Sequence, residues 1–229
     1  MTPVLQKHTI KLLWIMISSI IISLIVYLFI HKVSIVACIG VIDFLLKSFL
    51  YFLYQNKKKR ICPRVYWFTG LSGAGKSTLS EHFYQYLKDK GVKVEHLDGD
   101  YIRNIFPKIG FTKDQRIQHI KRVAFLASKL QQNGITVIAS FITPYNQSRD
   151  YIREVCSNYI EIYVSTPIEE CERRDVKGLY KKARRGEISN FTGIDDPFEI
   201  PKNPEIIIDT TNMEIEDSVK QIIKFSNKI

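Results

Sequence analysis

The chain begins with two long apolar stretches. The first, residues 12–30, reads LLWIMISSIIISLIVYLFI and contains no charged side chain. Its length matches the roughly 20 residues that a helix needs to cross the apolar core of a bilayer. A secretory signal peptide is the competing interpretation, but its apolar region is usually shorter, about 7 to 15 residues. No small-residue cleavage pattern follows the stretch, so we expect a transmembrane helix.

The second apolar stretch, residues 33–54, carries two charges, Asp43 and Lys47. Side chains four positions apart share one face of a helix and can pair, which lowers the cost of placing them in lipid. We therefore favour a second span, with a helix lying in the membrane interface as the alternative. Residues 1–55 are expected to form a membrane anchor of one or two transmembrane helices that contacts lipid through residues 12–54.

Basic residues flank the two stretches unequally. Lys7 and Lys11 precede the first stretch and the run KKKR at 57–60 follows the second, whereas the turn between them offers His31 and Lys32. Short cytoplasmic segments are enriched in Lys and Arg. We therefore expect a location in the cell membrane, with everything beyond a basic linker at 56–63 facing the cytoplasm.

Beyond Pro63, short apolar runs alternate with stretches that have helical periodicity. This pattern predicts an α/β domain over residues 64–229, with a mainly parallel five-stranded sheet flanked by helices. The expected strands are 64–70, 92–97, 135–140, 159–164 and 205–209, and the expected helices are 76–88, 115–132, 147–156, 168–174 and 215–225. Residues 175–204 show no clean period. Since structureless loops beyond about 12 to 15 residues are uncommon, we expect a lid or binding loop there.

The sequence GLSGAGKS at residues 70–77 lies between the first expected strand and its helix. It fits the phosphate-loop (P-loop) pattern G-x-x-x-x-G-K-[ST], in which glycines turn backbone N–H groups toward a phosphate and the helix N-terminus adds its positive dipole end. The lysine can reach the β and γ phosphates, and the serine hydroxyl can ligate Mg²⁺. ATP and Mg²⁺ are therefore the expected cofactors, and the residues expected to hold them are Gly70, Ser72, Gly73, Ala74, Gly75, Lys76, Ser77 and Thr78.

Two acids, Asp98 and Asp100, follow the second expected strand. They should lie at the carboxyl edge of the sheet, where α/β proteins bind ligands. One acid can stand beside the metal while the other receives a proton from a substrate hydroxyl. A solvated Asp-Gly turn is the alternative. No acid ends the expected strand at 135–140, so the arrangement typical of mechanochemical ATPases is missing and a small-molecule kinase is favoured.

The chain has 33 Lys and Arg against 23 Asp and Glu, a net charge of +10. Such a charge suits nucleic acid, an anionic membrane surface or an anionic small substrate. The basic residues gather at 57–60 and within 175–204, where other uses exist, so we expect no nucleic-acid partner. The cysteines at 38, 62, 156 and 171 show neither Cys-x-x-Cys pairing nor a nearby histidine ligand, which indicates neither a zinc site nor a disulfide framework.

Several longer motifs carry a family resemblance. They are GLSGAGKST at 70–78, LDGD at 97–100, ITPY at 142–145, ERRDVKGLYKKARRGEI at 172–188, FTGIDDPFEIP at 191–201 and PEIIIDT at 204–210. From residue 61 onward the chain resembles adenylylsulfate kinase, a family of P-loop kinases. The resemblance implies transfer of the γ-phosphoryl group of MgATP to the 3′-hydroxyl of adenosine 5′-phosphosulfate (APS), giving 3′-phosphoadenylyl sulfate for sulfate activation. It also suggests a homodimer.

The resemblance further implies roles for individual residues. Asp100 would take the hydroxyl proton, with Lys76 and Asp98 on the side of the transferred phosphoryl group and the metal. Arginines would hold the phosphosulfate, two phenylalanine rings would sandwich the adenine, and lid residues would approach the phosphates. The implied substrate-binding residues are Arg103, Phe111, Arg116, Ile142, Thr143, Lys177, Gly178, Leu179 and Phe191. Arginine forks suit phosphate and sulfate, and aromatic faces suit a purine.

The chain departs from the family pattern near the acceptor. Tyr101 and His119 stand where the family commonly has Asn, Gln115 stands where it has Asp, and the link before Gly110 is one residue shorter. These changes leave open a kinase of the same architecture that acts on another nucleotide-linked acid, such as a nucleotide phosphoramidate used in surface-polymer modification. Phosphorylation of Thr143 is also left open.

An anchored nucleotide-binding scaffold is the remaining alternative. The presence of both acids together with the P-loop lysine and serine argues against it, because a binder that does not catalyse has no need of the acids. A membrane location would suit delivery to a sulfotransferase or assembly with a sulfurylase.

Overall fold

The computed structural model describes residues 3–31, 35–57, 62–105 and 110–228, and in the first two of these ranges it describes the side chains of residues 13–29 and 39–51. The chain divides into two compact units, Met1–Arg60 and Ile61–Ile229. The finer division into an anchor, a linker and a kinase domain stays a prediction. The basic flanks used to predict orientation and the shortened link before Gly110 involve side chains or residues outside the described ones.

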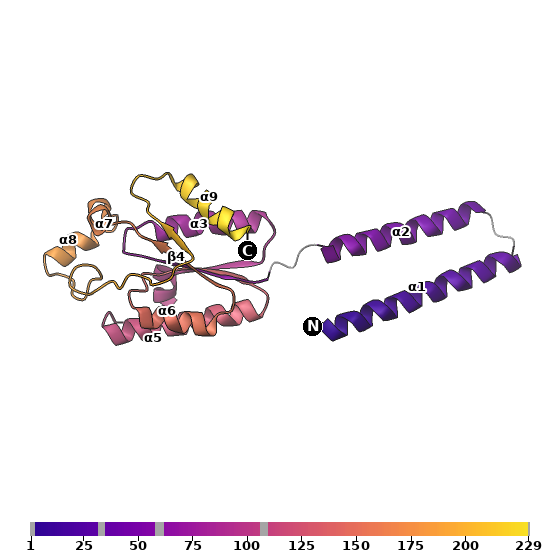
Figure 1. The fold of residues 1–229 in the computed structure, drawn as a ribbon, viewed down its shortest axis with the longest axis horizontal. Coiled ribbons are helices and arrows are strands. Elements are labelled where there is room, and N and C mark those ends of the chain that lie inside the picture. The colour runs from indigo at the N-terminus through magenta and orange to yellow at the C-terminus, as the bar shows by residue number, and fades with distance from the viewer. Residues whose placement is uncertain (1–2, 32–34, 58–61, 106–109, 229) are drawn as a thin grey trace. The chain divides into compact units, whose positions relative to one another are not determined.

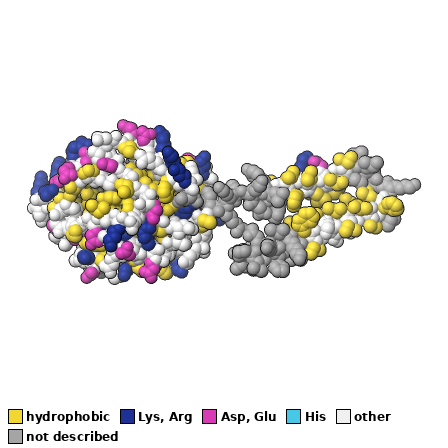
Figure 2. All heavy atoms as spheres, viewed as in Figure 1, with side chains coloured by type: hydrophobic (Ala, Val, Ile, Leu, Met, Phe, Trp, Pro, Cys, Tyr) yellow, Lys and Arg dark blue, Asp and Glu magenta, His cyan; other side chains and the backbone are white. Residues whose placement is uncertain are grey.

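The described part of the first unit consists of two helices, α1 (Pro3–His31) and α2 (Ile35–Lys57). The rings of Trp14 and Phe49 meet edge to face with centroids 6.5 Å apart, and Lys47 pairs with Asp43 at 2.6 Å, as their spacing predicted. Large apolar side chains are exposed on both helices, including Phe29 and Phe44, and Figure 2 shows them in yellow.

Over the residues that the structure describes, no helix is both apolar enough and long enough to cross a bilayer. Over this described part of the chain, the prediction of membrane-crossing helices within residues 12–54 is therefore not supported.

The second unit is built on a five-stranded sheet in which every pairing is parallel, in the order β2-β3-β1-β4-β5. The strands are β1 (Val65–Thr69), β2 (Val94–Asp98), β3 (Thr136–Ser140), β4 (Tyr159–Val164) and β5 (Ile206–Ile208). The central strand β1 is buried along its whole length, as expected of a parallel strand covered on both faces. The predicted α/β architecture is confirmed.

Helices cover both faces of this sheet. As Figure 1 shows, α3 (Lys76–Asp89) and α9 (Ile215–Ser226) lie on one face, and α5 (Lys113–Gln132) and α6 (Asn146–Val155) lie on the other. Side chains alternate across a strand, so Tyr66 and Phe68 of β1 join the core beneath α3 and α9. Val65 and Trp67 join the core beneath α5 and α6. The unit therefore has three layers, with the sheet in the middle.

Among the residues of this unit that the structure describes, three further helices are short: α4 (Gly99–Ile105), α7 (Ile168–Arg174) and α8 (Leu179–Arg184). Of these, α7 was expected and the other two were not. Helix α4 begins at Gly99, directly after β2, where a solvated Asp-Gly turn was the alternative. Helix α8 lies inside the segment expected to form a lid, 175–204, and that role stays a prediction.

Candidate functional site

A cavity of about 640 Å³ is lined by the loop after β1, the ends of β2 and β3, the start of α5 and the segment from Arg174 to Thr192. It lies at the carboxyl edge of the sheet, where ligands are expected in open α/β folds. The predicted site residues that line it are Ser72, Gly73, Gly75, Lys76, Ser77, Thr78, Asp98, Asp100, Arg103, Phe111, Arg116, Ile142, Thr143, Lys177, Leu179 and Phe191. Gly70, Ala74 and Gly178 are not among the lining residues.

The P-loop joins β1 to α3 in a conformation that depends on glycine. Gly70 has a φ of 150°, and a Cβ added there would lie 2.4 Å from the carbonyl oxygen of Val164 on the neighbouring strand. Behind the loop, the carbonyl oxygen of Ala74 accepts hydrogen bonds from the hydroxyls of Thr166 at 3.1 Å and Thr210 at 3.0 Å. Gly70 and Ala74 therefore shape and hold the loop without lining the cavity.

Lys76, the first residue of α3, folds back across this loop. Its Nζ donates to the carbonyl oxygen of Leu71 at 2.7 Å, and only 9% of the residue is exposed. Burial lowers the pKa of Lys76 to about 8, and the positive charge of Lys177 acts in the same direction. The ammonium group is therefore held at the phosphate loop at some cost in solvation.

Asp98 ends β2 and is held by hydroxyl and amide donors. Its Oδ2 accepts from the hydroxyls of Ser77 and Ser140, each at 2.9 Å, and its Oδ1 accepts from the backbone N–H of Asp100 at 3.0 Å. Although burial raises the pKa of Asp98, the hydrogen bonds from Ser140 and Ser77 bring it below its usual value. Asp98 is therefore kept as a carboxylate.

The pair of Ser77 and Asp98 fits a magnesium ion bound together with a nucleotide. Mg²⁺ takes oxygen ligands and is usually held by one or two protein groups plus substrate phosphates and waters. A hydroxyl and a carboxylate 2.9 Å apart supply such a pair. Among the described residues, no group of three or more His, Cys, Asp or Glu side chains could hold a metal on its own. The site thus suits a metal shared with phosphates.

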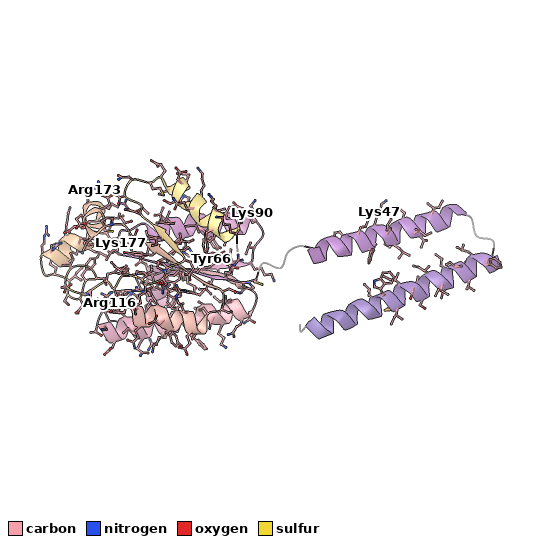
Figure 3. All side chains as sticks on the ribbon, viewed as in Figure 1. Lys47, Tyr66, Lys90, Arg116, Arg173 and Lys177 are labelled. Carbon is pink, nitrogen blue, oxygen red and sulfur yellow. The ribbon has the colours of Figure 1, made fainter. Side chains whose placement is uncertain are left out.

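Asp100 lies two residues further on, at the start of α4, with most of its side chain exposed. The Nζ of Lys177 pairs with its Oδ2. Lys177 comes from the segment between α7 and α8 and is labelled in Figure 3. The acid predicted to act as the base is therefore in contact with a cation from the predicted lid.

The two predicted anion-binding arginines flank one phenylalanine ring. The guanidinium carbon of Arg103 lies 4.6 Å from the ring centroid of Phe111, and that of Arg116 lies 5.4 Å from it. Arg116, labelled in Figure 3, also donates from Nε to the carbonyl oxygen of Phe111 at 2.8 Å and from Nη2 to that of Asn190. The groups predicted to recognise an anion and a purine are thus in contact with one another.

Phe191, the second predicted ring, is 9% exposed and meets the ring of Tyr180 edge to face at 4.9 Å. The Tyr180 hydroxyl donates to the carbonyl oxygen of Ser72 at 2.9 Å. Helix α8 therefore connects the P-loop to this ring. On another wall, Trp67 Nε1 donates to the buried hydroxyl of Thr143 at 2.8 Å, and Thr143 has a φ of 47°.

Sequence reasoning missed several residues of the cavity, among them Arg174, Tyr180 and Asn190. Arg174 binds Thr210 through two hydrogen bonds of 2.8 Å. Arg174 and Tyr180 lie within the run at 172–188 that carried the family resemblance, which was the available signal. No pattern in the sequence pointed to Asn190, because its backbone carbonyl makes the contact with Arg116.

The three substituted positions among the departures from the family pattern, Tyr101, Gln115 and His119, differ in location. His119 lines the cavity, and its ring lies 6.0 Å from that of Phe141. Burial, aided by Arg103 and Arg122, lowers the pKa of His119 to about 4. Tyr101 and Gln115 do not line the cavity. Gln115 instead completes a capping box with Thr112 at the start of α5, which fixes the first turn of the helix that carries Arg116.

The second unit is similar to proteins of one known family. The family model for adenylylsulphate kinase matches residues 62–209. The adenylyl-sulfate kinase of Picosynechococcus sp. is 49% identical over 159 residues, which cover 69% of this chain and 90% of the relative. That of Halothermothrix orenii is 49% identical over 160 residues, which cover 69% and 86% of the two chains.

Two solved structures extend the comparison. The Mycobacterium tuberculosis APS kinase in complex with AMPPNP and APS superposes with a TM-score of 0.69 at 36% identity, covering 72% of this chain and 98% of that one. The hexameric APS kinase from Thiobacillus denitrificans superposes with a TM-score of 0.57 at 31% identity, covering 77% of this chain and 31% of that one.

Proposed function

The chain belongs to the adenylylsulphate kinase family, and on that premise we propose how its cavity transfers the γ-phosphoryl group of ATP to the 3′-hydroxyl of adenosine 5′-phosphosulfate. The products are ADP and 3′-phosphoadenylyl sulfate. One observation carries the proposal: a single cavity is lined by the P-loop, by Asp100 and by the cluster of Arg103, Phe111 and Arg116. A phosphoryl donor and an anionic purine acceptor can thus be held in one cavity.

On the donor side, the backbone N–H groups of the P-loop and the ammonium group of Lys76 hold the β and γ phosphates of ATP. To reach them, Lys76 exchanges its hydrogen bond to Leu71 for phosphate oxygens. Ser77 and Asp98 would hold Mg²⁺, which neutralises charge on the phosphates when it is bound. Asp98 suits this position because it stays ionised.

On the acceptor side, Asp100 takes the proton of the 3′-hydroxyl at a carboxylate oxygen. The hydroxyl oxygen then bonds to the γ-phosphorus as the bond from phosphorus to the β–γ bridging oxygen breaks, and the leaving electron pair stays on ADP. Asp100 has to exchange its contact with Lys177 for the substrate hydroxyl. Lys177 is then available to the phosphates, with Gly178 and Leu179 beside it.

The acceptor itself is held by charge and by stacking. Arg103 and Arg116 pair with the phosphate and sulfate groups, since planar guanidinium forks suit such anions. Phe111 and Phe191 bind the adenine through their faces. Ile142 and Thr143 form part of the adjoining wall.

A direct assay tests this function. The full chain is supplied with MgATP and adenosine 5′-phosphosulfate, and the products are separated and identified by mass. We expect ADP and 3′-phosphoadenylyl sulfate in equal amounts. A nucleotide phosphoramidate offered in competition should be a poor acceptor. Preferred phosphorylation of that compound, or no phosphorylation of adenosine 5′-phosphosulfate, would contradict the assigned reaction.

We also propose that the first unit attaches the kinase to the cell membrane with the catalytic unit in the cytoplasm. The support is the uncharged stretch at 12–30, the basic run at 57–60 and the exposed apolar side chains of α1 and α2. Attachment would place the product beside a membrane-bound sulfotransferase or the substrate beside a sulfurylase. A homodimer is proposed on the family resemblance and is checked by light scattering on the purified chain.

A further inference from the structure

A largely buried acid lies beside the anion-binding arginine of the acceptor site. The Oδ2 of Asp196 is 3.8 Å from the Nε of Arg116, and the two side chains are 13% and 8% exposed. The hydroxyl of Tyr145 donates to both carboxylate oxygens of Asp196 at 2.8 Å. Neither Asp196 nor Tyr145 lines the cavity. Asp196 thus approaches the arginine from outside the cavity, and Tyr145 contacts Asp196 in turn.

We propose that Asp196 and Tyr145 form a positioning pair that holds Arg116 in the orientation needed to bind the anionic group of the acceptor. The inference rests on the role proposed above for Arg116. It adds two residues that touch no substrate and act through the arginine.

The hydrogen bonds of Arg116 define the orientation of its guanidinium group. A guanidinium group offers five N–H donors in a rigid planar fork. Its Nε donates to the carbonyl oxygen of Phe111 at 2.8 Å, and its Nη2 donates to the carbonyl oxygen of Asn190. Fixing two of the nitrogens fixes the plane of the fork, and with it the direction of the remaining N–H donors.

The charge of Asp196 stabilises Arg116 without taking up its N–H donors. Burial lowers the pKa of Arg116, and Asp196 is the largest opposing influence. At 3.8 Å the carboxylate is beyond normal hydrogen-bond length, so it offsets the cost of burying the cation while leaving the guanidinium donors to other partners. Desolvation, and then the hydrogen bond to Asp196, raise the pKa of Tyr145 to about 12, which keeps its hydroxyl a donor.

The segment that carries Asp196 is itself held firmly. The carboxylate of the preceding residue, Asp195, accepts from the backbone N–H groups of Asn190 at 2.6 Å and Phe191 at 2.5 Å. The backbone N–H of Gly193 donates to the carbonyl oxygen of Asp196 at 2.7 Å. Consecutive acids therefore support two parts of the acceptor site: Asp195 binds the backbone of Asn190 and Phe191, and Asp196 places its charge beside Arg116.

Two conservative substitutions test the positioning pair. Asp196→Asn removes the charge but keeps an oxygen for Tyr145, and Tyr145→Phe removes the hydroxyl but keeps the ring. Each should raise the KM for adenosine 5′-phosphosulfate about tenfold, because Arg116 would lose its alignment with the anionic group of the acceptor. The KM for ATP should stay within about twofold. Asp217→Asn and Tyr151→Phe are matched controls outside the cavity and should change neither KM.

A double-mutant cycle separates positioning from a general structural role. If Tyr145 acts through Arg116, Tyr145→Phe should have little further effect on the acceptor KM in an Arg116→Lys background, because coupled residues are not additive. An equal effect in both backgrounds would overturn the inference, as would variants that lower the melting temperature but leave the acceptor KM unchanged. If Asp196→Asn does not fold, Tyr145→Phe and its cycle decide the question. A wild-type chain that does not phosphorylate adenosine 5′-phosphosulfate contradicts the proposed function instead.

Discussion

At the scale of single residues, the cavity keeps its charged groups in contacts that substrates have to replace. Lys177 is paired with Asp100, and Lys76 donates to the carbonyl oxygen of Leu71. Each contact occupies a group that the proposed reaction needs. Binding of ATP and of the acceptor therefore exchanges one set of polar contacts for another.

Asp100→Asn tests the base directly. The amide keeps the shape of the side chain but cannot accept the proton, so kcat should fall by roughly 10²- to 10⁴-fold, while ATP binds with nearly unchanged affinity. The rate of product formation at saturating substrate gives kcat, and calorimetry gives the affinity for ATP. Asp114→Asn, at an acid in the first turn of α5, is the control. Near-normal turnover of Asp100→Asn would refute the assignment.

The lowered pKa of Lys76 predicts how ATP binding depends on pH. With a pKa of about 8, the side chain is charged below that pH and neutral above it, and only the charged form attracts phosphate strongly. ATP affinity should therefore fall as pH rises through about 8, with proton uptake on binding in that range. Calorimetry in buffers of different ionisation enthalpy measures both. A dissociation constant that stays the same from about pH 7 to about pH 9 would contradict the prediction.

The P-loop and acidic residues could be predicted from sequence because their positions depend on local spacing. A strand, a glycine-rich turn and a helix place Lys76 and Ser77 whatever the rest of the chain does. Tyr145 and Asp196 could not be predicted, because their contact joins positions 51 residues apart. That contact arises from tertiary packing of α6 against the 190–200 segment, which no local pattern specifies.

At the scale of elements, a buried arginine joins α6 to the edge of the site. Arg149 donates from Nη1 to the carbonyl oxygen of Thr143, and from Nη2 to that of Glu199 and to Asn146 Oδ1. Its Nε lies 3.7 Å from Glu161 on β4, and both side chains are 3% exposed. One side chain thus ties a helix, a strand and two loops together.

Arg149→Ala should therefore destabilise the protein strongly. The change leaves the buried carboxylate of Glu161 with Arg153 as its remaining cation and removes the arginine donor from the carbonyl oxygens of Thr143 and Glu199. Losing one partner of a buried ion pair costs about 3 to 5 kcal/mol. Urea unfolding followed by circular dichroism measures the free energy of unfolding. Arg173→Ala, at an exposed arginine that pairs with Glu170 and is labelled in Figure 3, is the control and should change the free energy of unfolding little; equal effects would contradict the argument.

The long elements were predictable from apolar runs, and the two unexpected helices were not. Helices α4 and α8 have seven and six residues, too short to show a helical period. Asp175 supports α8 by accepting from the backbone N–H groups of Tyr180 at 2.9 Å and Lys181 at 3.1 Å. Such capping satisfies the first helical donors, but an aspartate three residues before a glycine also suits an ordinary turn.

At the scale of the whole molecule, the chain combines two units of different character. The second has its own core on both faces of the sheet and carries the similarity to known kinases. The first exposes large apolar side chains, of a kind that folded proteins usually cover. Composition along the chain was sufficient to predict this contrast, but not how the first unit is used.

Membrane attachment predicts different behaviour for the full chain and for residues 61–229. The full chain should float with vesicles of anionic phospholipid in a density gradient, and residues 61–229, which contain the whole core, should stay at the bottom with kinase activity intact. A wash with concentrated salt distinguishes attachment by apolar side chains from attachment by charge, since salt releases a protein that is held by charge alone. A full chain that stays with the soluble fraction would contradict the proposal.

The hydrogen bond between Trp67 and Thr143 bears on the route that the phosphoryl group takes. Thr143 is 1% exposed, and its oxygen accepts the indole N–H at 2.8 Å. Phosphorylation of that oxygen would remove the hydrogen-bond partner of the Trp67 indole. It would also place a dianion next to the stacked rings of Trp67 and Phe141. A two-step relay through a phosphothreonine is therefore disfavoured, and the group should pass from nucleotide to nucleotide in one displacement with inversion at phosphorus.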